Sequence, residues 1–403
     1  MKKKKLVQIN TVFYASTGRI MADIQKYAEL QGYDTISFVG RGPASKNIKG
    51  KVFGNPISFW SHVILTTVFD AQGYGSYFAT KKLIRWLREE NPDIIHLHNL
   101  HGYYLHIPTL CRYLKEEYKG KVFWTFHDCW PVTGHCAYFV SVNCNQWKKE
   151  CRKCPKKKEY PISFFFDGSK RNFRMKQKWF TSIPNLMIIA PSQWIKDIVR
   201  ESFLKDRYVE VVNNGIDLSI FHPQSDKNIW EKYNVPFGKK ILLGVANIWD
   251  KRKGIGDFLS LADTLSDEYH IVLVGLTKRQ IKKMPDNITG LERTDNIEDL
   301  VKIYSSASIF INPSLEESFS LVTVEAMACG TPVIVLDTSA VKELVDERCG
   351  LILAKHMPQD YINAIQQIMK NNLQSADIRA RAEQYGIEKM KKRVIKLYKA
   401  GEN

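Results

Sequence analysis

Short apolar runs alternate along the whole chain with longer amphipathic stretches. The short runs are rich in β-branched residues, which favour buried strands, and the stretches between them have the apolar spacing of helices. One such helix is predicted over residues 77–90, ending before Asn91-Pro92. This alternation is typical of βα units around a parallel sheet. In the first half of the chain the predicted strands span residues 6–13, 35–39, 94–98, 122–126, 186–190 and 209–212.

The alternation stops at residues 213–223, NNGIDLSIFHP, and then restarts. The Asn, Gly and Pro content of this segment indicates a connection between two units. The strands predicted after it span residues 240–246, 270–274, 307–312, 331–336 and 351–354. Two successive α/β halves imply two Rossmann-like, doubly wound domains that face one another across a cleft.

We expect an N-terminal domain at 1–213, a C-terminal domain at 214–380, and a final helical segment at 381–403 that returns to the N-terminal domain. The end of the chain, residues 378–399, is predicted to form one or two helices with a basic face. A basic face is usually a solvated face, which we favour here over a role in binding a membrane or a partner.

The composition is that of an ordinary globular protein, with 403 residues, 44% hydrophobic and 25% charged. This excludes collagen-like, coiled-coil and wholly disordered chains. The formal net charge of +17 predicts attraction to nucleic acid, to an anionic lipid surface or to phosphate-bearing substrates. Polar Gln8, Asn10 and Thr11 interrupt the apolar stretch near the N-terminus, which does not fit a cleavable signal. We therefore expect a cytoplasmic chain, peripheral on the inner face of the membrane.

The most informative stretch is 311–335, INPSLEESFSLVTVEAMACGTPVIV. It predicts a buried strand, a polar loop, a helix over 321–329, and a second strand. Gly330 stands where a left-handed residue ends a helix, and Pro332 prevents continuation. A helix N-terminus in such a unit is a ready phosphate site. We expect the amides of residues 319–321 to face a diphosphate.

Several side chains accompany this predicted phosphate site. Glu317 and Glu325 can line the same pocket, where carboxylates suit paired sugar hydroxyls. The predicted donor-binding residues of the loop and helix start are Glu325, Ser318, Phe319, Ser320 and Leu321.

Glu317 and Glu325, with seven residues between them and AMACGTPV after them, resemble the signature of the retaining family-four (group 1) glycosyltransferases of the GT-B fold. The resemblance implies that Glu317 contacts the transferred sugar and Glu325 the nucleotide ribose. NNGIDLSIFHP is similar to the interdomain segment of that family. TFHD at 125–128 is similar to the strand end whose histidine, here His127, lies beside the donor sugar. DKRKG at 250–254 is similar to the basic loop that binds the donor diphosphate through Lys253.

The chain departs from the family pattern at three places. Ile248 stands where the family usually has an arginine, so we assign that role to Arg252. Serines 318 and 320 replace glycines that are common around the first glutamate. The glycine-rich loop after the first strand is reduced to Ser16-Thr17-Gly18-Arg19. A lone glycine there more often makes a tight turn than a phosphate cradle, and we retain Gly18 as a donor-site candidate.

The resemblance implies transfer of a sugar from a nucleotide-diphosphate sugar to a saccharide or lipid-linked acceptor, in exopolysaccharide or other surface polysaccharide synthesis. Retention of configuration is expected from same-face attack, with the departing phosphate as base. Lys253, Arg252 and the helix start would stabilise that phosphate, so no catalytic metal is expected. The expected catalytic residues are His127, Glu317, Lys253 and Arg252, with His127 as a hydrogen-bond partner of the sugar.

Two other functions remain open. An epimerase or a phosphorylase acting on sugar phosphates would use the same fold. A basic nucleic-acid-binding protein would explain the net charge, but the sequence has no helix-turn-helix, RRM or KH signature, so nucleic acid is disfavoured as a partner. His96, His98, His101 and His106 also suggest a metal site, but no matching carboxylate set follows, and we favour packing or cleft lining.

A cysteine-rich insertion is predicted at about 129–160. Its thiols are spaced as Cys, seven residues, Cys, six residues, Cys, two residues, Cys. The Cys-x2-Cys end followed by Pro155 resembles a zinc knuckle, and four thiolates would complete a tetrahedral structural zinc site. Free thiols, or disulfides in an exported chain, are the alternatives. Lysines and the aromatic run 164–166 nearby suit an anionic membrane surface, and they would suit nucleic acid equally well. The four candidate ligands are Cys136, Cys144, Cys151 and Cys154.

Overall fold

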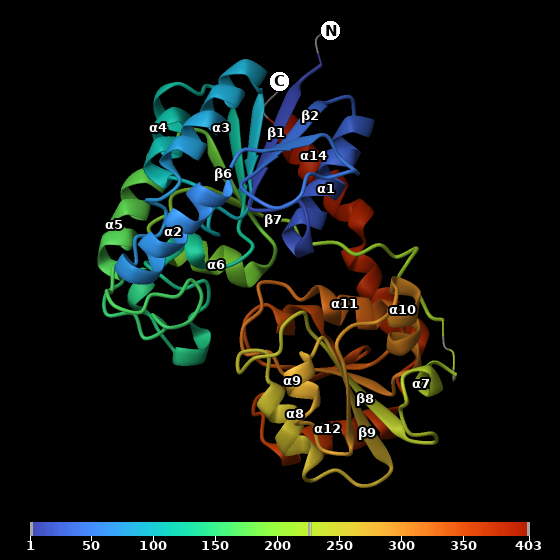
Figure 1. Ribbon diagram of the computed structural model, residues 1–403. Helices are drawn as coiled ribbons and strands as arrows, with labels where there is room; N and C mark the ends of the chain where they lie inside the picture. The colour runs from blue at the N-terminus through green and yellow to red at the C-terminus, as the bar shows by residue number, and fades with distance from the viewer. Residues whose placement is uncertain (1–2, 225, 227, 401–403) are drawn as a thin grey trace. The chain divides into compact units, whose positions relative to one another are not determined.

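The computed structural model describes residues 3–224, 226 and 228–400. It divides into two compact units, each drawn with its own sheet in Figure 1. The first unit contains the residues up to Asn213 together with those from Lys391 onward, and the second unit runs from Asn214 to Met390.

The first unit is built on a seven-stranded sheet in the order β3-β2-β1-β4-β5-β6-β7. Every neighbouring pair is parallel. The strand order reverses between β1 and β4, and ligands of such sheets bind beyond the carboxyl ends of the strands at that point. The strands are β1 (Lys5–Asn10), β2 (Asp34–Val39), β3 (Gly50–Val52), β4 (Ile94–Leu97), β5 (Lys121–Thr125), β6 (Leu186–Ala190) and β7 (Tyr208–Val211).

Helices cover both faces of this sheet, with α3, α4 and α5 on one side and α1 and α14 on the other (Figure 1). The segment between β5 and α5 consists of loops and three short 3-10 turns, η1 (Trp130–Val132), η2 (Val140–Val142) and η3 (Gln146–Lys148). The helices between the strands are α1 (Ala15–Leu30), α2 (Pro56–Phe69), α3 (Tyr77–Glu90), α4 (Ile107–Glu116), α5 (Ser169–Phe180) and α6 (Gln193–Glu201).

The second unit has a six-stranded parallel sheet in the order β10-β9-β8-β11-β12-β13. Its strands are β8 (Lys240–Val245), β9 (Tyr269–Val274), β10 (Ile288–Leu291), β11 (Ile309–Asn312), β12 (Val333–Leu336) and β13 (Gly350–Leu353). Its helices are α7 (Ile229–Lys232), α8 (Ile255–Ala262), α9 (Lys278–Ile281), α10 (Ile297–Ser306), α11 (Leu321–Ala328), α12 (Pro358–Asn371) and α13 (Ser375–Ala382), with the short turns η4 (Val341–Leu344) and η5 (Glu383–Tyr385).

The last helix, α14 (Ile387–Lys399), contributes residues to both units, because the division falls after Met390. Its apolar side packs into the first unit through Tyr398, which is fully buried. The Tyr398 hydroxyl lies 2.6 Å from His96 Nδ1, and its ring centroid lies 4.9 Å from that of Phe123. Its lysines are mostly exposed, as expected of a solvated basic face.

The predicted α/β class with two Rossmann-like sheets is confirmed. The helix predicted over 77–90 is α3, and the strands agree to within one to three residues at their ends. The first strand ends at Asn10, earlier than predicted, where the Asn10 side chain accepts from Thr11 N and donates to Val12 O. The short edge strands β3 and β10 were not predicted. No helix in the described ranges is long and apolar enough to cross a bilayer.

Candidate functional site

In the second unit, the loop between β11 and α11 is held by the side chain of Asn312, the last residue of β11. Its Nδ2 donates to Ser320 Oγ and to Thr323 Oγ1, both at 2.9 Å, and its Oδ1 accepts from Ser314 N at 3.1 Å. All four residues are buried. The strand end thus fixes both the start of the loop and the first turn of the helix.

Ser320 caps α11 in the left-handed region, at φ 91° and ψ 82°. A residue with a Cβ is strained there, and glycine is the usual occupant. The hydrogen bond that Ser320 Oγ accepts from Asn312 supports this conformation. Ser320 therefore adopts a backbone conformation that usually needs glycine. The first backbone amides of α11, which have no hydrogen-bond partners within the helix, therefore lie near the carboxyl end of β11.

Glu317 lies in the same loop and is 8% exposed. Its amide donates to Ser339 Oγ at 2.9 Å, and its carbonyl accepts from Ala340 N at 3.1 Å, so the backbone is fixed from the β12 side. Lys253 Nζ donates to Glu317 Oε1 at 2.5 Å. The structure therefore brings together two of the predicted catalytic residues, which lie 64 positions apart in the sequence.

Arg252 is bound to the neighbouring part of this loop. Its NH1 donates to Glu316 O at 3.0 Å, and its carbonyl accepts from Leu315 N at 2.9 Å. Gly254, the N-cap residue of α8, has φ 75°, and a Cβ there would lie 2.5 Å from Pro313 O. Only glycine allows this close approach of the basic loop to the loop after β11. Ile248, which occupies the family's usual arginine position, is 69% exposed.

Glu325 projects from the second turn of α11 and is 7% exposed. The hydroxyl of Tyr304 donates to Glu325 Oε2 at 3.1 Å. Tyr304 is fully buried, with its ring packed near Phe310, so it holds the carboxylate from inside the unit. Of the remaining predicted donor-binding residues, Phe319 is buried, and Ser318 and Leu321 are partly exposed.

In the first unit, His127 follows β5 and is 8% exposed. Its Nε2 lies 3.1 Å from Nδ1 of His98, and the two rings are stacked. His98 Nε2 lies 3.1 Å from the amide oxygen of Gln8, whose amide nitrogen donates to Met21 O. Since that oxygen can only accept, His98 carries its proton on Nε2 and accepts at Nδ1. His127 then donates from Nε2 and keeps Nδ1 as an acceptor.

These histidines are neutral in the folded protein. Burial, with a smaller contribution from neighbouring imidazoles, lowers the pKa of His96 to about 3 and that of His98 well below its ordinary value. Burial also lowers the pKa of His127 to about 4. A neutral ring at His127 suits hydrogen bonding to a sugar hydroxyl better than an electrostatic role.

His101 and His106, the other two histidines considered as metal ligands, each have their own hydrogen-bond partners. His101 Nε2 lies 2.7 Å from Asp128 Oδ2, and its Nδ1 lies 3.0 Å from the hydroxyl of Tyr160. His106 caps α4, because its Nδ1 accepts from Thr109 N at 3.2 Å. The four histidines therefore contribute to hydrogen-bond networks and a helix cap.

Gly18 lies inside α1, and the turn expected around it is wrong. A Cβ at this position would lie 2.5 Å from the carbonyl carbon of Phe13 and 3.1 Å from Val12 O. The glycine therefore lets the first turns of α1 pack against the backbone that leaves β1. Close packing accounts for the absence of a side chain at Gly18.

The four cysteines of the insertion line one small cavity of the first unit, together with His135. The thiols of Cys136 and Cys154 share a hydrogen bond, which contributes to a raised pKa for Cys136 and a lowered pKa for Cys154. All four are unbridged. Among the described residues, no group of three or more His, Cys, Asp or Glu side chains has the arrangement that holds a metal ion. The zinc site stays a prediction.

His135 was not predicted to belong to this cluster. It is 1% exposed, and its Nδ1 lies 2.8 Å from Asp70 Oδ1. Its Nε2 is buried and has no hydrogen-bond partner among the residues that the structure describes. A histidine held by a carboxylate through one nitrogen, with the other nitrogen unpartnered, has the arrangement of a metal-ligating histidine and its outer partner.

Models of known protein families match the sequences of both units. The model of glycosyltransferase family 4 matches residues 18–220, and the model of the group 1 glycosyl transferases matches residues 239–371. The chain belongs to these glycosyltransferases. It is therefore a transferase enzyme, and the matched ranges include His127, Lys253, Glu317 and Glu325.

Curated relatives agree with this assignment. The chain is 23% identical over 326 residues to the "Putative colanic acid biosynthesis glycosyl transferase WcaC" of Escherichia coli K12, covering 78% of this chain and 76% of that protein. It is 24% identical to the D-inositol 3-phosphate glycosyltransferase of Corynebacterium jeikeium K411, covering 72% and 67%. The similarity to the enzyme of the same name from Nocardiopsis dassonvillei spans only 41% of that enzyme.

Solved structures with the same fold cover almost the whole chain. Sucrose-phosphate synthase from Thermosynechococcus elongatus has a TM-score of 0.73 at 18% identity, with 98% of each chain covered. Anabaena Alr3699/HepE in complex with UDP and glucose has a TM-score of 0.69 at 14% identity, covering 98% of this chain and 99% of that one. The fold is the GT-B fold that the resemblance implied.

The sequence did not indicate the residues that hold the predicted site in place. Asn312, Ser339 and Tyr304 bind the site residues across 8 to 22 positions of sequence. The position of Asn312 at the end of a predicted strand was the available signal, because polar strand ends line ligand sites in parallel sheets.

Proposed function

We propose that the protein is a retaining glycosyltransferase that moves a sugar from a nucleotide-diphosphate sugar to a saccharide or lipid-linked acceptor in surface polysaccharide synthesis. The contact between Lys253 and Glu317 carries this proposal. It joins the basic loop before α8 to the loop before α11, where a diphosphate and its sugar would meet. The similarity to WcaC, and the UDP and glucose bound by a structural neighbour, support the substrate class.

The donor diphosphate is assigned to Lys253, Arg252 and the first amides of α11. The side chains of Lys253 and Glu317, taken without their backbones, are 19% and 11% exposed, so the ion pair is partly desolvated. Positive groups in such surroundings interact more strongly with a phosphate than in water. An incoming diphosphate would take over Lys253, which leaves the Glu317 carboxylate for the sugar hydroxyls. Glu325 is assigned to the ribose, with Tyr304 fixing its orientation.

The transfer exchanges one bond at the anomeric carbon for another. The bond from that carbon to the β-phosphate oxygen breaks, and the electron pair leaves with the nucleoside diphosphate. The acceptor hydroxyl oxygen attacks on the same face, and its proton passes to the departing phosphate oxygen. Lys253 and Arg252 stabilise the charge that develops on that phosphate. His127, neutral and with Nδ1 as acceptor, is assigned a hydrogen bond to a sugar hydroxyl.

A binding assay followed by product analysis tests the proposal. The purified protein is heated with UDP, GDP or ADP, and one of them should raise Tm, because a ligand at about 100 times its Kd stabilises by about 2.7 kcal/mol. The corresponding nucleotide sugars are then incubated with candidate acceptors, and the anomeric configuration of the product is read by NMR. Retention supports the mechanism, and an inverted product contradicts it. Epimerised or phosphorolysed sugar without transfer contradicts the function.

We also propose that the cysteine cavity holds a structural zinc ion whose ligands come from the four thiols and His135. Thiolates and imidazole are the ligands that zinc prefers, and the buried Nε2 of His135 supports a ligand at this place. Elemental analysis of freshly reduced protein should find one zinc per chain, and a Cys151→Ser variant should lose it and melt at lower temperature. Reduced protein that holds no zinc overturns this proposal without affecting the transferase assignment.

A further inference from the structure

Helix α2 of the first unit buries polar side chains and exposes apolar ones. The residues that it buries are the polar His62 and Thr66. The residues that it exposes include Ile57, at 83%, and Trp60, at 61%. We call the exposed side chains Ile57, Trp60, Ile64 and Phe69 the α2 apolar face. An exposed apolar face of this kind on a folded unit marks an interaction surface.

The aromatic loop, residues Phe164, Phe165 and Phe166, continues this face. Phe164 N donates to Thr67 O at 2.8 Å, and Phe166 N donates to Val68 O at 3.2 Å, so the loop runs beside the last turn of α2. The rings of Phe69 and Phe166 are stacked, with centroids 5.6 Å apart. All three phenylalanines of the loop are exposed, Phe165 by 71%. The loop thus joins α2 at Phe69, and this helix and loop together expose seven large apolar side chains.

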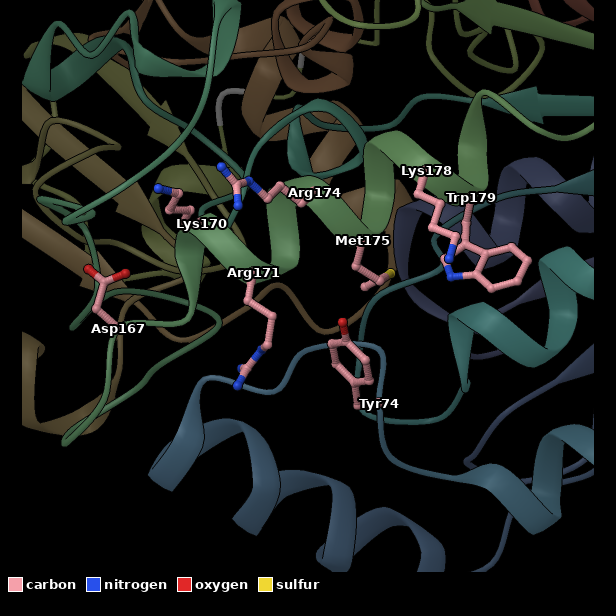
Figure 2. A pocket seen from close by; sticks show the side chains of 8 residues that line it. All are labelled: Tyr74, Asp167, Lys170, Arg171, Arg174, Met175, Lys178 and Trp179. Atoms are coloured by element: carbon pink, nitrogen blue, oxygen red, sulfur yellow. The ribbon is translucent and has the colours of Figure 1, made fainter.

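A basic cavity of about 610 Å³ adjoins this surface along α5. Four exposed cations of α5 line it, namely Lys170, Arg171, Arg174 and Lys178. Arg171 NH2 donates to Phe69 O at 2.9 Å and to Asp70 O at 2.7 Å, which fixes the cavity against the end of α2. Figure 2 shows Arg171 reaching from α5 toward the loop that follows α2.

The charge of the cavity is only partly compensated. Lys170 and Arg174 both approach the same carboxylate, Glu150, at 3.4 and 2.6 Å. Asp167, which also lines the cavity, accepts from Ser169 and from Cys154 N. Two carboxylates therefore face four cations. Lys157, whose Nζ donates to Phe165 O at 3.2 Å, adds a cation beside the aromatic loop.

We propose that this surface docks the protein on an anionic phospholipid membrane. The α2 apolar face and the aromatic loop enter the boundary between headgroups and acyl chains, and the α5 cations bind lipid phosphates. Apolar side chains next to uncompensated cations are the combination that an anionic bilayer surface selects, because the apolar groups leave water while the cations meet phosphate. A purely apolar partner would leave the cations unpaired, and a nucleic acid would leave the apolar face in water.

Flotation of the full-length protein with vesicles tests this inference. Binding is compared between vesicles of phosphatidylcholine alone and vesicles of phosphatidylcholine mixed with phosphatidylglycerol. We expect binding to the anionic vesicles only. The variant Trp60→Ser/Ile64→Ser/Phe165→Ser should lower the partition coefficient at least about tenfold. The variant Lys170→Gln/Arg174→Gln/Lys178→Gln should lower it by about a hundredfold, since each cation near such a surface contributes about fivefold.

Matched controls separate this surface from general charge and general apolarity. Phe237→Ser changes an aromatic residue of the second unit that is 96% exposed, and Lys392→Gln/Lys396→Gln removes exposed charges of α14. Both should bind vesicles like the unmodified protein. All variants should keep the Tm shift with nucleotide, which shows an intact fold. The inference is overturned if the protein ignores anionic vesicles, if the α2 and α5 variants bind unchanged, or if the apolar variant only converts a dimer into a monomer.

Discussion

Lys253 Nζ lies 2.5 Å from Glu317 Oε1, so a cation and a carboxylate of the predicted donor site are paired with each other. Each supplies the charge that the other needs while no phosphate is present. In the function proposed above, a phosphate that binds Lys253 would break this contact and leave the carboxylate for the sugar. The proposal thus couples the state of Glu317 to the binding of the diphosphate.

The first prediction concerns that pair. Lys253→Ala removes the cation that stabilises the leaving phosphate, and we expect kcat to fall at least about a hundredfold. Steady-state kinetics measure this change in kcat, with the nucleotide sugar that corresponds to the nucleotide found by the Tm screen. Lys240→Ala, which breaks an exposed ion pair with Glu268 in the same unit, is the control and should leave kcat unchanged. Full activity of Lys253→Ala would remove this residue from the site.

The second prediction concerns Glu325 and its positioning residue. Glu325→Gln should weaken nucleotide binding about tenfold or more, since hydrogen bonds to charged groups contribute about 1.5–3 kcal/mol. Tyr304→Phe removes the hydroxyl that orients Glu325, and we expect a higher KM for the donor with kcat nearly kept. Tyr269→Phe in β9 is the matched control. If Tyr304→Phe changes only Tm and not KM, its role is structural.

The third prediction separates packing from ligand binding at Gly18. Gly18→Ala places a methyl group 2.5 Å from the Phe13 carbonyl carbon, and overpacking of this kind costs about 1–3 kcal/mol. We expect a lower Tm with unchanged nucleotide affinity. Gly256→Ala in α8, where a Cβ meets nothing within 4 Å, should be neutral or stabilising. Lost nucleotide affinity at unchanged Tm would instead make Gly18 a donor-site residue.

The fourth prediction is a pH dependence of stability caused by the buried histidines. The folded pKa of His96 is about 3, below the ordinary 6.5, so the unfolded chain binds more protons between these values. Stability is then full above pH 6.5 and falls as the pH drops toward 3. For His96 alone the loss between pH 7 and pH 5 is about 2 kcal/mol.

Urea unfolding of the full-length protein, followed for the first unit at both pH values, measures this loss. A His96→Gln variant should lose less stability on acidification than the unmodified protein. His356→Gln, at an exposed residue of the second unit, is the control and should keep the original dependence. An unchanged dependence in His96→Gln would contradict the assignment.

The sequence predicted the central strands because each is a short apolar run between polar turns. β3 and β10 were missed for a local reason, since they have only three and four residues, lie at sheet edges and include Gly50 or Gly290. Helix α2 was missed because its apolar residues lack the regular spacing of an amphipathic helix. Which of its apolar residues are exposed can be told only from the structure.

Candidate site residues could be named from the sequence where chemistry and spacing are local. Glu317, Glu325 and Lys253 stand in short motifs, and the structure places Lys253 against Glu317. Tyr304 and Ser339 have no motif, because their contribution depends on how α10 and the loop after β12 pack against the site. The left-handed backbone of Ser320 could not be predicted either, because serine rarely adopts a positive φ.

The chain passes between the two units twice, once after Asn213 and again within α14. The core around His96 is closed by Tyr398, 302 positions later in the sequence. During synthesis the strands of the first unit leave the ribosome before Tyr398 does, so the core of this unit cannot be completed until the whole of the second unit has been made. A fragment ending at Asn213 would therefore carry an unfilled hole in its interior, and expressing that unit alone requires α14 to be joined back to it.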